Sequence, residues 1–164
     1  YLVDLKVYTL NTSDRSVQPF DIGRDWMRTS IPIFSFDRKF MAFTADNKTM
    51  IRDASSSKES TFDVNGEKIL WSGDSTQLAI YDSYRKMYVA LPNEGGLQEI
   101  HSLSAVGDLE DWIWLSDNQH ILLIVVDGDG NRQLGVLSVV EKTLTPINLS
   151  LLNEYDPVSF SFRP

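Results

Sequence analysis

Four short stretches of the sequence resemble one another and recur at similar intervals. Each places an aromatic residue just before a polar turn: Phe34-Ser-Phe-Asp37, Trp71-Ser-Gly-Asp74, Trp114-Leu-Ser-Asp117 and Phe160-Ser-Phe-Arg163. The intervals between the four aromatic residues are 37, 43 and 46 residues. A period in this range indicates one supersecondary unit that is copied along the chain. The sequence therefore predicts a repeat protein.

The similarity extends beyond the aromatic residues. Phe34 to Thr44 aligns without a gap with Trp71 to Tyr81, and Val7 to Phe20 aligns in the same way with Leu134 to Ile147. The second pair lies 127 residues apart, which is close to three repeats. We therefore expect half a unit, three whole units and the first strand of another. Their expected ranges are 1–22, 30–64, 67–103, 111–149 and 157–164.

Each unit divides into four short segments of strand length. In the last whole unit these are 112–115, 121–126, 134–140 and 144–149, rich in β-branched and aromatic residues. A hairpin signal, Asp127-Gly-Asp-Gly130, separates the second segment from the third. No segment keeps the apolar spacing of a helix over three turns. The pattern predicts an all-β fold of four-stranded antiparallel blades, repeated radially as a segment of a β-propeller.

The aromatic-Ser-x-Asp turn followed by an apolar strand resembles the WD40-like repeat of TolB-type propellers. Val126-Asp-Gly-Asp-Gly-Asn-Arg-Gln-Leu134 is similar to the second turn of that repeat. The chain departs from the family at the first turn, which usually reads Pro-Asp-Gly, and it lacks the Gly-His and Trp-Asp pairs of true WD40 repeats. The resemblance implies a propeller that serves as the sensory or scaffolding part of a bacterial envelope protein. It favours a periplasmic or other extracytoplasmic location, with the cytoplasm as the alternative.

Charge and composition limit the kinds of partner. The net charge is −8, and no basic stripe suited to nucleic-acid phosphates or an anionic membrane is visible. We expect neither nucleic acid nor membrane contact by this segment. The chain has no cysteine, which rules out disulfides and thiolate metal sites. Its two histidines, His101 and His120, lack a second ligand at metal-binding spacing, so we expect no cofactor.

Two other motifs are candidates for chemistry. Asp127, Asp129 and Asn131 alternate like the opening of a calcium loop, but Arg132 follows them and the later Glu is misplaced. We favour a hairpin turn in which Gly128 and Gly130 supply positive φ. The sequence also lacks a Gly-x-Ser-x-Gly nucleophile elbow, and the acids near residue 110 are interpreted as a solvated loop. These features predict a module without catalytic activity.

Loops that lead into the first strand of each blade gather at one mouth of a propeller. Here these loops are 23–30, 64–68, 105–111 and 153–157. Their aromatic, basic and acidic residues suit a site for a protein partner or a small ligand. The candidate binding residues are Trp26, Met27, Arg28, Asp108, Glu110, Asp111, Trp112, Glu154 and Tyr155. The alternative is that Trp26 only covers the edge of a blade.

Two functions remain open at this point. The first is a recognition module without catalytic activity. The second is the propeller domain of a larger serine peptidase of the prolyl-oligopeptidase kind, whose catalytic domain would lie elsewhere. The chain opens at Tyr1 and closes at Pro164, both inside a unit, so we expect it to belong to a longer protein and a larger propeller. An open propeller exposes strand edges, so self-association is also expected.

Overall fold

The structure is a computed structural model that describes residues 7–10, 13–20, 30–56 and 58–147. These residues form β-strands joined by turns and contain no helix. The first blade consists of β3 (Ile33–Phe34), β4 (Phe40–Ala45), β5 (Lys48–Asp53) and β6 (Glu59–Phe62). The second consists of β7 (Gly66–Trp71), β8 (Leu78–Asp82), β9 (Lys86–Leu91) and β10 (Gly96–Ser102). The third consists of β11 (Asp108–Trp114), β12 (His120–Val126), β13 (Arg132–Ser138) and β14 (Leu144–Ile147).

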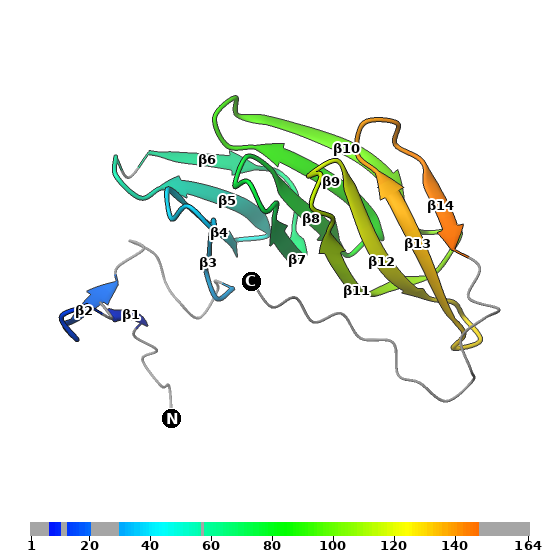
Figure 1. The fold of residues 1–164 in the computed structure, drawn as a ribbon, viewed down its shortest axis with the longest axis horizontal. Coiled ribbons are helices and arrows are strands. Elements are labelled where there is room, and N and C mark those ends of the chain that lie inside the picture. Colours follow the sequence, from blue (N-terminus) through cyan, green and yellow to red (C-terminus); the bar gives the residue numbers. More distant parts are fainter. Residues whose placement is uncertain (1–6, 11–12, 21–29, 57, 148–164) are drawn as a thin grey trace.

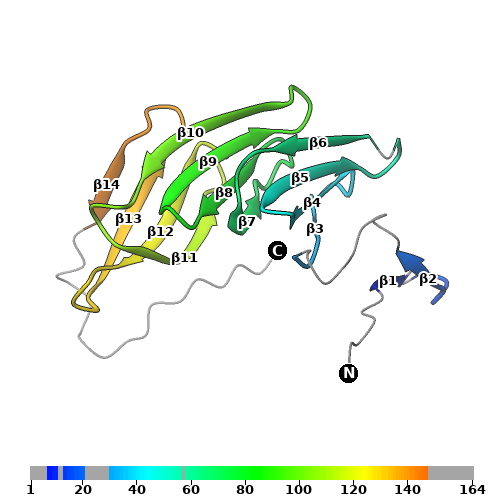
Figure 2. The same cartoon turned by 180° about the vertical axis from the view of Figure 1, so that it is seen from behind.

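Each blade is a four-stranded antiparallel sheet whose strands are paired in sequence order. The two opposite views in Figures 1 and 2 show the three sheets side by side in a fan. The predicted all-β fold of repeated four-stranded blades is therefore confirmed. No helix in the described part of the chain has the length and hydropathy needed to span a bilayer.

A separate two-stranded sheet repeats the outer half of the third blade. It consists of β1 (Val7–Leu10) and β2 (Val17–Phe20). Tyr8 pairs with Pro19 in this sheet, as Gly135 pairs with Pro146 between β13 and β14. The β1–β2 pair and the β13–β14 pair thus have the same register at an offset of 127 residues, as the sequence alignment requires. The strand expected at 157–164 lies outside the described residues.

The polar turn after each aromatic residue has the same geometry in all three blades. Asp37, Asp74 and Asp117 each accept, through Oδ1, the backbone N–H of the residue two positions later, at 3.1, 3.1 and 2.9 Å. The residue next to each aspartate has positive φ, with values of 61°, 65° and 54° for Arg38, Ser75 and Asn118. Such an aspartate-closed turn satisfies backbone donors that strand pairing leaves free. The repeated motif is therefore a turn that connects the first two strands of a blade.

Neighbouring blades are joined by equivalent hydrogen bonds at these turns. The indole Nε1–H of Trp71 donates to the carbonyl of Ile33 at 3.2 Å, and that of Trp114 donates to the carbonyl of Leu70 at 3.1 Å. Each acceptor directly precedes the aromatic residue of the preceding blade. A buried indole needs such an acceptor, so the two tryptophans fix the position of one blade on the next.

The space between blades is filled by apolar side chains from both neighbours. One cluster joins the first and second blades and includes Ile51, Trp71 and Ile80. Another joins the second and third blades and includes Trp114 and Leu123. All five side chains are buried. Because burial of apolar area is the main favourable term in folding, these interfaces stabilise the radial arrangement.

Two aspartates that accept hydrogen bonds from adjacent turns, Asp37 and Asp53, make the stability of the protein depend on pH. Hydrogen bonds hold the pKa of Asp37 and that of Asp53 at about 2, mainly through the backbone N–H of Lys39 and the hydroxyl of Ser55. An unfolded aspartate has a pKa of about 3.9, so this stabilisation is complete above that value and is lost as the pH falls towards 2. Urea unfolding at a series of pH values should show a falling free energy of unfolding below pH about 4. The Asp37→Asn/Asp53→Asn variant should show a shallower fall, and an unchanged slope would contradict this assignment.

Candidate functional site

The connections between strands lie on two opposite faces of the blades. The linker face, as we call it, carries residues 46–47, 63–65, 83–85, 103–107 and 127–131. The turn face carries, among the described residues, 35–39, 54–56, 58, 72–77, 92–95, 115–119 and 139–143. Backbone bonds support this grouping, since Leu103 N donates to Arg85 O on the linker face and Ala54 N donates to Lys39 O on the turn face. Of the four loops predicted to form a mouth, 64–68 and 105–111 are fully described, and both begin on the linker face.

The acidic stretch before Trp112 is strand and not the loop that the sequence suggested. β11 already begins at Asp108, and only the start of the expected 105–111 loop is a connection. Leu109 is buried, while Asp108 and Glu110 are exposed. The pairing register shifts between Leu109 and Asp111, so Glu110 is the extra residue of a bulge. This bulge interrupts the alternation of a regular strand, and the acids therefore looked like a loop.

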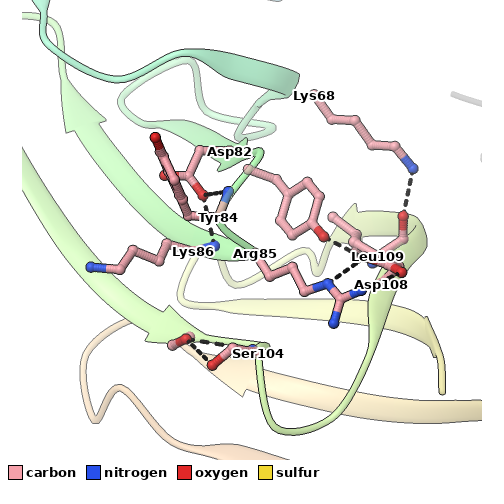
Figure 3. A network of polar contacts seen from close by, with 10 residues as sticks. Lys68, Asp82, Tyr84, Arg85, Lys86, Ser104, Asp108 and Leu109 are labelled. Atoms are coloured by element: carbon pink, nitrogen blue, oxygen red, sulfur yellow. Dashed lines mark hydrogen bonds and ion pairs between the residues drawn. The ribbon is translucent and has the colours of Figure 1, made fainter. Parts of the chain in front are cut away.

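A cross-blade network joins the second and third blades at the linker face (Figure 3). The guanidinium of Arg85 binds the Asp108 carboxylate through two bonds of 2.6 and 2.9 Å. Lys68 donates through Nζ to the carbonyls of Leu109 and Glu110, at 2.7 and 2.8 Å. Paired Arg–carboxylate bonds fix geometry as well as charge. The structure thus brings the predicted segments 64–68 and 105–111 together.

Two of the predicted acids of this face, Asp108 and Glu110, are paired with arginines. Arg132 binds Glu110 through two bonds of 2.6 Å, and this pair lowers the pKa of the Glu110 carboxyl. Asp111 accepts the backbone N–H of Trp112 at 2.8 Å. Trp112 is half-buried and packs against the apolar cluster between the second and third blades. At Asp108 and Glu110 the face therefore carries paired charges and not free carboxylates.

Tyr84 was not identified from the sequence, although it is the most exposed aromatic residue of the linker face among the described residues. Tyr84 is 77% exposed and lies at the tip of the β8–β9 turn. The buried Asp82 holds this turn by accepting the N–H groups of Tyr84 and Lys86 at 2.9 and 2.8 Å (Figure 3). Arg85 follows directly and anchors the turn to Asp108. The hairpin sequence Asp82-Ser-Tyr-Arg85 could have indicated this residue, because an aromatic side chain at the tip of a turn cannot reach the core.

The calcium candidate has the geometry of a hairpin turn. Asp127 Oδ1 accepts the backbone N–H groups of Asp129 and Asn131 at 3.0 and 2.9 Å. The Asn131 side-chain amide also donates to both Asp127 oxygens, at 3.3 and 3.1 Å. Gly130 has a φ of 85°, but Gly128 is not among the glycines with positive φ, contrary to the expectation. The Asp127 carboxylate is thus occupied by the backbone of its own turn and by the Asn131 side chain, as in a closed hairpin turn.

The remaining predicted site residues cannot be placed on this face. Trp26, Met27 and Arg28, and also Glu154 and Tyr155, lie outside the described residues. Of the nine predicted binding residues, the described part contains Asp108, Glu110, Asp111 and Trp112. The site that can be built therefore consists of the β8–β9 turn, the start of β11 and the basic residues that bind it.

No protein-family model matches the sequence, and no curated protein shows significant similarity to it. Solved structures resemble it in fold. Dipeptidyl peptidase 4 of Porphyromonas gingivalis matches with a TM-score of 0.64 and 15% identity, over 87% of this chain and 28% of its own. The TolB-type protein of Agrobacterium tumefaciens matches with a TM-score of 0.57 and 13% identity, over 87% of this chain and 53% of its own.

An acylaminoacyl peptidase of Pyrococcus horikoshii also matches, with a TM-score of 0.54 and 11% identity, over 72% of this chain and 25% of its own. The chain thus spans between a quarter and about half of the lengths of these three structures. At such low identities the likeness establishes the fold, which is that of a β-propeller. Fold alone does not define function, because one fold can serve many functions.

Proposed function

We propose that this chain is a recognition module without catalytic activity, which binds a protein or a small ligand through its linker face. The proposal rests on the exposed Tyr84, which directly precedes Arg85 and its bidentate pair with Asp108. Tyrosine and arginine are enriched among the residues that dominate binding energy. A turn held by Asp82 and by the next blade would lose little conformational entropy on binding. The TolB-type fold supports a periplasmic or other extracytoplasmic role.

Replacing Tyr84 with alanine tests this proposal. The side chain makes few contacts within its own blade, so we expect stability to stay within about 0.5 kcal/mol of the wild type. If Tyr84 is a central contact, the affinity for the partner should fall by about thirtyfold. The partner is first recovered from cell extract by pull-down with the wild type. Its dissociation constant is then measured by titration with the wild type and with Tyr84→Ala. Phe36→Ala is the matched control, since Phe36 is 70% exposed on the turn face. Equal losses in both variants, or none in Tyr84→Ala, would refute the linker face as the binding surface.

A second candidate is the propeller domain of a prolyl-oligopeptidase-like serine peptidase. Two of the structures named above are peptidases, and this chain covers only 28% and 25% of them. In that case a catalytic domain would lie elsewhere in the same polypeptide. The coding sequence around this segment distinguishes the two candidates, since the peptidase requires a Gly-x-Ser-x-Gly nucleophile elbow in an α/β-hydrolase domain. Its absence from the whole protein would exclude the peptidase.

A further inference from the structure

A cavity of about 260 Å³ opens on the turn face, away from the linker face. It lies between the β5–β6 turn of the first blade and the β9–β10 turn of the second. The two turns occupy the same end of their blades in Figure 1. Its lining residues are Phe40, Ile51, Asp53, Lys58, Ser60, Pro92, Asn93, Glu94 and Gly95. The cavity thus joins an apolar wall to a polar rim that carries charge.

The charges of this rim favour a cationic ligand. Asp53 makes its turn bonds through Oδ1, with Ser55 N, Ser55 Oγ and Ser56 N at 2.8, 2.6 and 2.8 Å. None of these three bonds uses Oδ2, the second oxygen of the same carboxylate. Those bonds lower the pKa of the Asp53 carboxyl to about 2, so it is ionised at neutral pH. Glu94 adds a second carboxylate from the other blade, and Lys58 is the single cation of the lining.

The residues that form the wall of the cavity are not repeated at the equivalent positions of the other two blades. Asp53 pairs with Phe40, and the strand registers put Leu91 and Ser138 at the Asp53 position of the second and third blades. Gln77 and His120 take the place of Phe40. The Phe40 ring also stacks on Trp71, with ring centroids 6.1 Å apart, which fixes the wall. An aromatic wall beside a carboxylate is thus a property of the first blade and not of the repeat.

We propose that this cavity binds the side chain of an arginine presented by a protein partner. The alkyl stem of the arginine would lie against Phe40, Ile51 and Pro92. Its planar guanidinium would bind the carboxylates of Asp53 and Glu94, which line the cavity from different blades. A guanidinium matches carboxylates in this way better than an ammonium does, because its donors form a fixed planar fork.

The test is an NMR titration of the protein with N-acetyl-arginine-N-methylamide and with the uncharged citrulline analogue. We expect saturable shift changes at the backbone amides of Ser60, Asn93 and Gly95 with the arginine compound only. Asp53→Asn keeps an oxygen for the turn but loses the charge, and should weaken binding by about tenfold. Lys58→Gln should strengthen binding, because it removes the one repulsive charge. Asp37→Asn is the matched control, since Asp37 closes a similar turn outside the cavity.

Several results would overturn the proposal. These are equal binding of citrulline, shift changes spread over both faces, no saturable change at all, or equal loss in Asp37→Asn and Asp53→Asn. Spermidine provides a further arm. If it binds at the same amides much more tightly than the arginine compound, the cavity is a polyamine site and not a site for a protein side chain. None of these outcomes depends on Tyr84, so this proposal and the linker-face proposal can fail separately.

Discussion

Replacing Trp114 with alanine should destabilise the protein by about 3–5 kcal/mol. The side chain is 7% exposed and belongs to the apolar cluster between the second and third blades. The substitution would remove a large buried ring and leave a cavity that the surrounding strands cannot fill. It would also remove the indole bond to the carbonyl of Leu70. The free energy of unfolding from urea titrations, followed by far-UV circular dichroism, measures the effect.

Trp114→Phe separates the hydrogen bond from most of the packing. Phenylalanine keeps an aromatic ring but cannot donate to Leu70, so we expect a smaller loss of about 1–3 kcal/mol. Phe36→Ala is the control for aromatic removal on the surface, with an expected change of about 0.5 kcal/mol or less. A loss in Trp114→Ala that is no larger than that of the control would mean that the two blades are not packed on each other through Trp114.

Replacing Gly107 with alanine is expected to cost about 3 kcal/mol or more. Gly107 has a φ of 149° and ends the connection from the second blade to the third. A Cβ atom there would lie 2.1 Å from the carbonyl oxygen of Val126 and 2.7 Å from its carbon. These are backbone atoms of a paired strand, so neither side can move without breaking the sheet. Thermal and urea unfolding of the variant measure the loss.

Gly128→Ala is the matched control for this substitution. Gly128 has open space around the position of a Cβ atom and no positive φ. Its stability should stay within about 0.5 kcal/mol of the wild type. Similar unfolding free energies for Gly107→Ala and Gly128→Ala would contradict the close approach of Gly107 to the backbone of Val126.

The spacing of the aromatic residues was sufficient to predict the repeated sheets. Trp71 and Trp114 end the first strands of their blades, and the polar turns follow them, because a motif that packs between blades must recur in each blade. The 127-residue alignment likewise predicted the shared register of β1–β2 and β13–β14. Strand starts were less predictable. The bulge at Glu110 breaks the alternation by which a strand can be recognised.

The binding surface was only partly predictable. The sequence indicated that 64–68 and 105–111 would meet, since both precede the first strand of a blade. The pairing of Arg85 with Asp108, and of Lys68 with the carbonyl of Leu109, could not be predicted from the sequence. These contacts depend on how one blade is rotated relative to the next, which no local pattern encodes. These pairs change the interpretation of the face, because two of the acids predicted to form its rim, Asp108 and Glu110, are already bound by arginines.

The most direct test of the radial arrangement is a nuclear Overhauser measurement on the tryptophan indole protons. We expect cross-peaks from the Trp71 indole proton to protons of Ile33 and Phe34, and from the Trp114 indole proton to protons of Leu70 and Trp71. Each indole donates a hydrogen bond to the preceding blade. Both indole protons should also exchange slowly with solvent. Cross-peaks confined to each tryptophan's own blade, together with fast exchange, would contradict the packing of consecutive blades on one another.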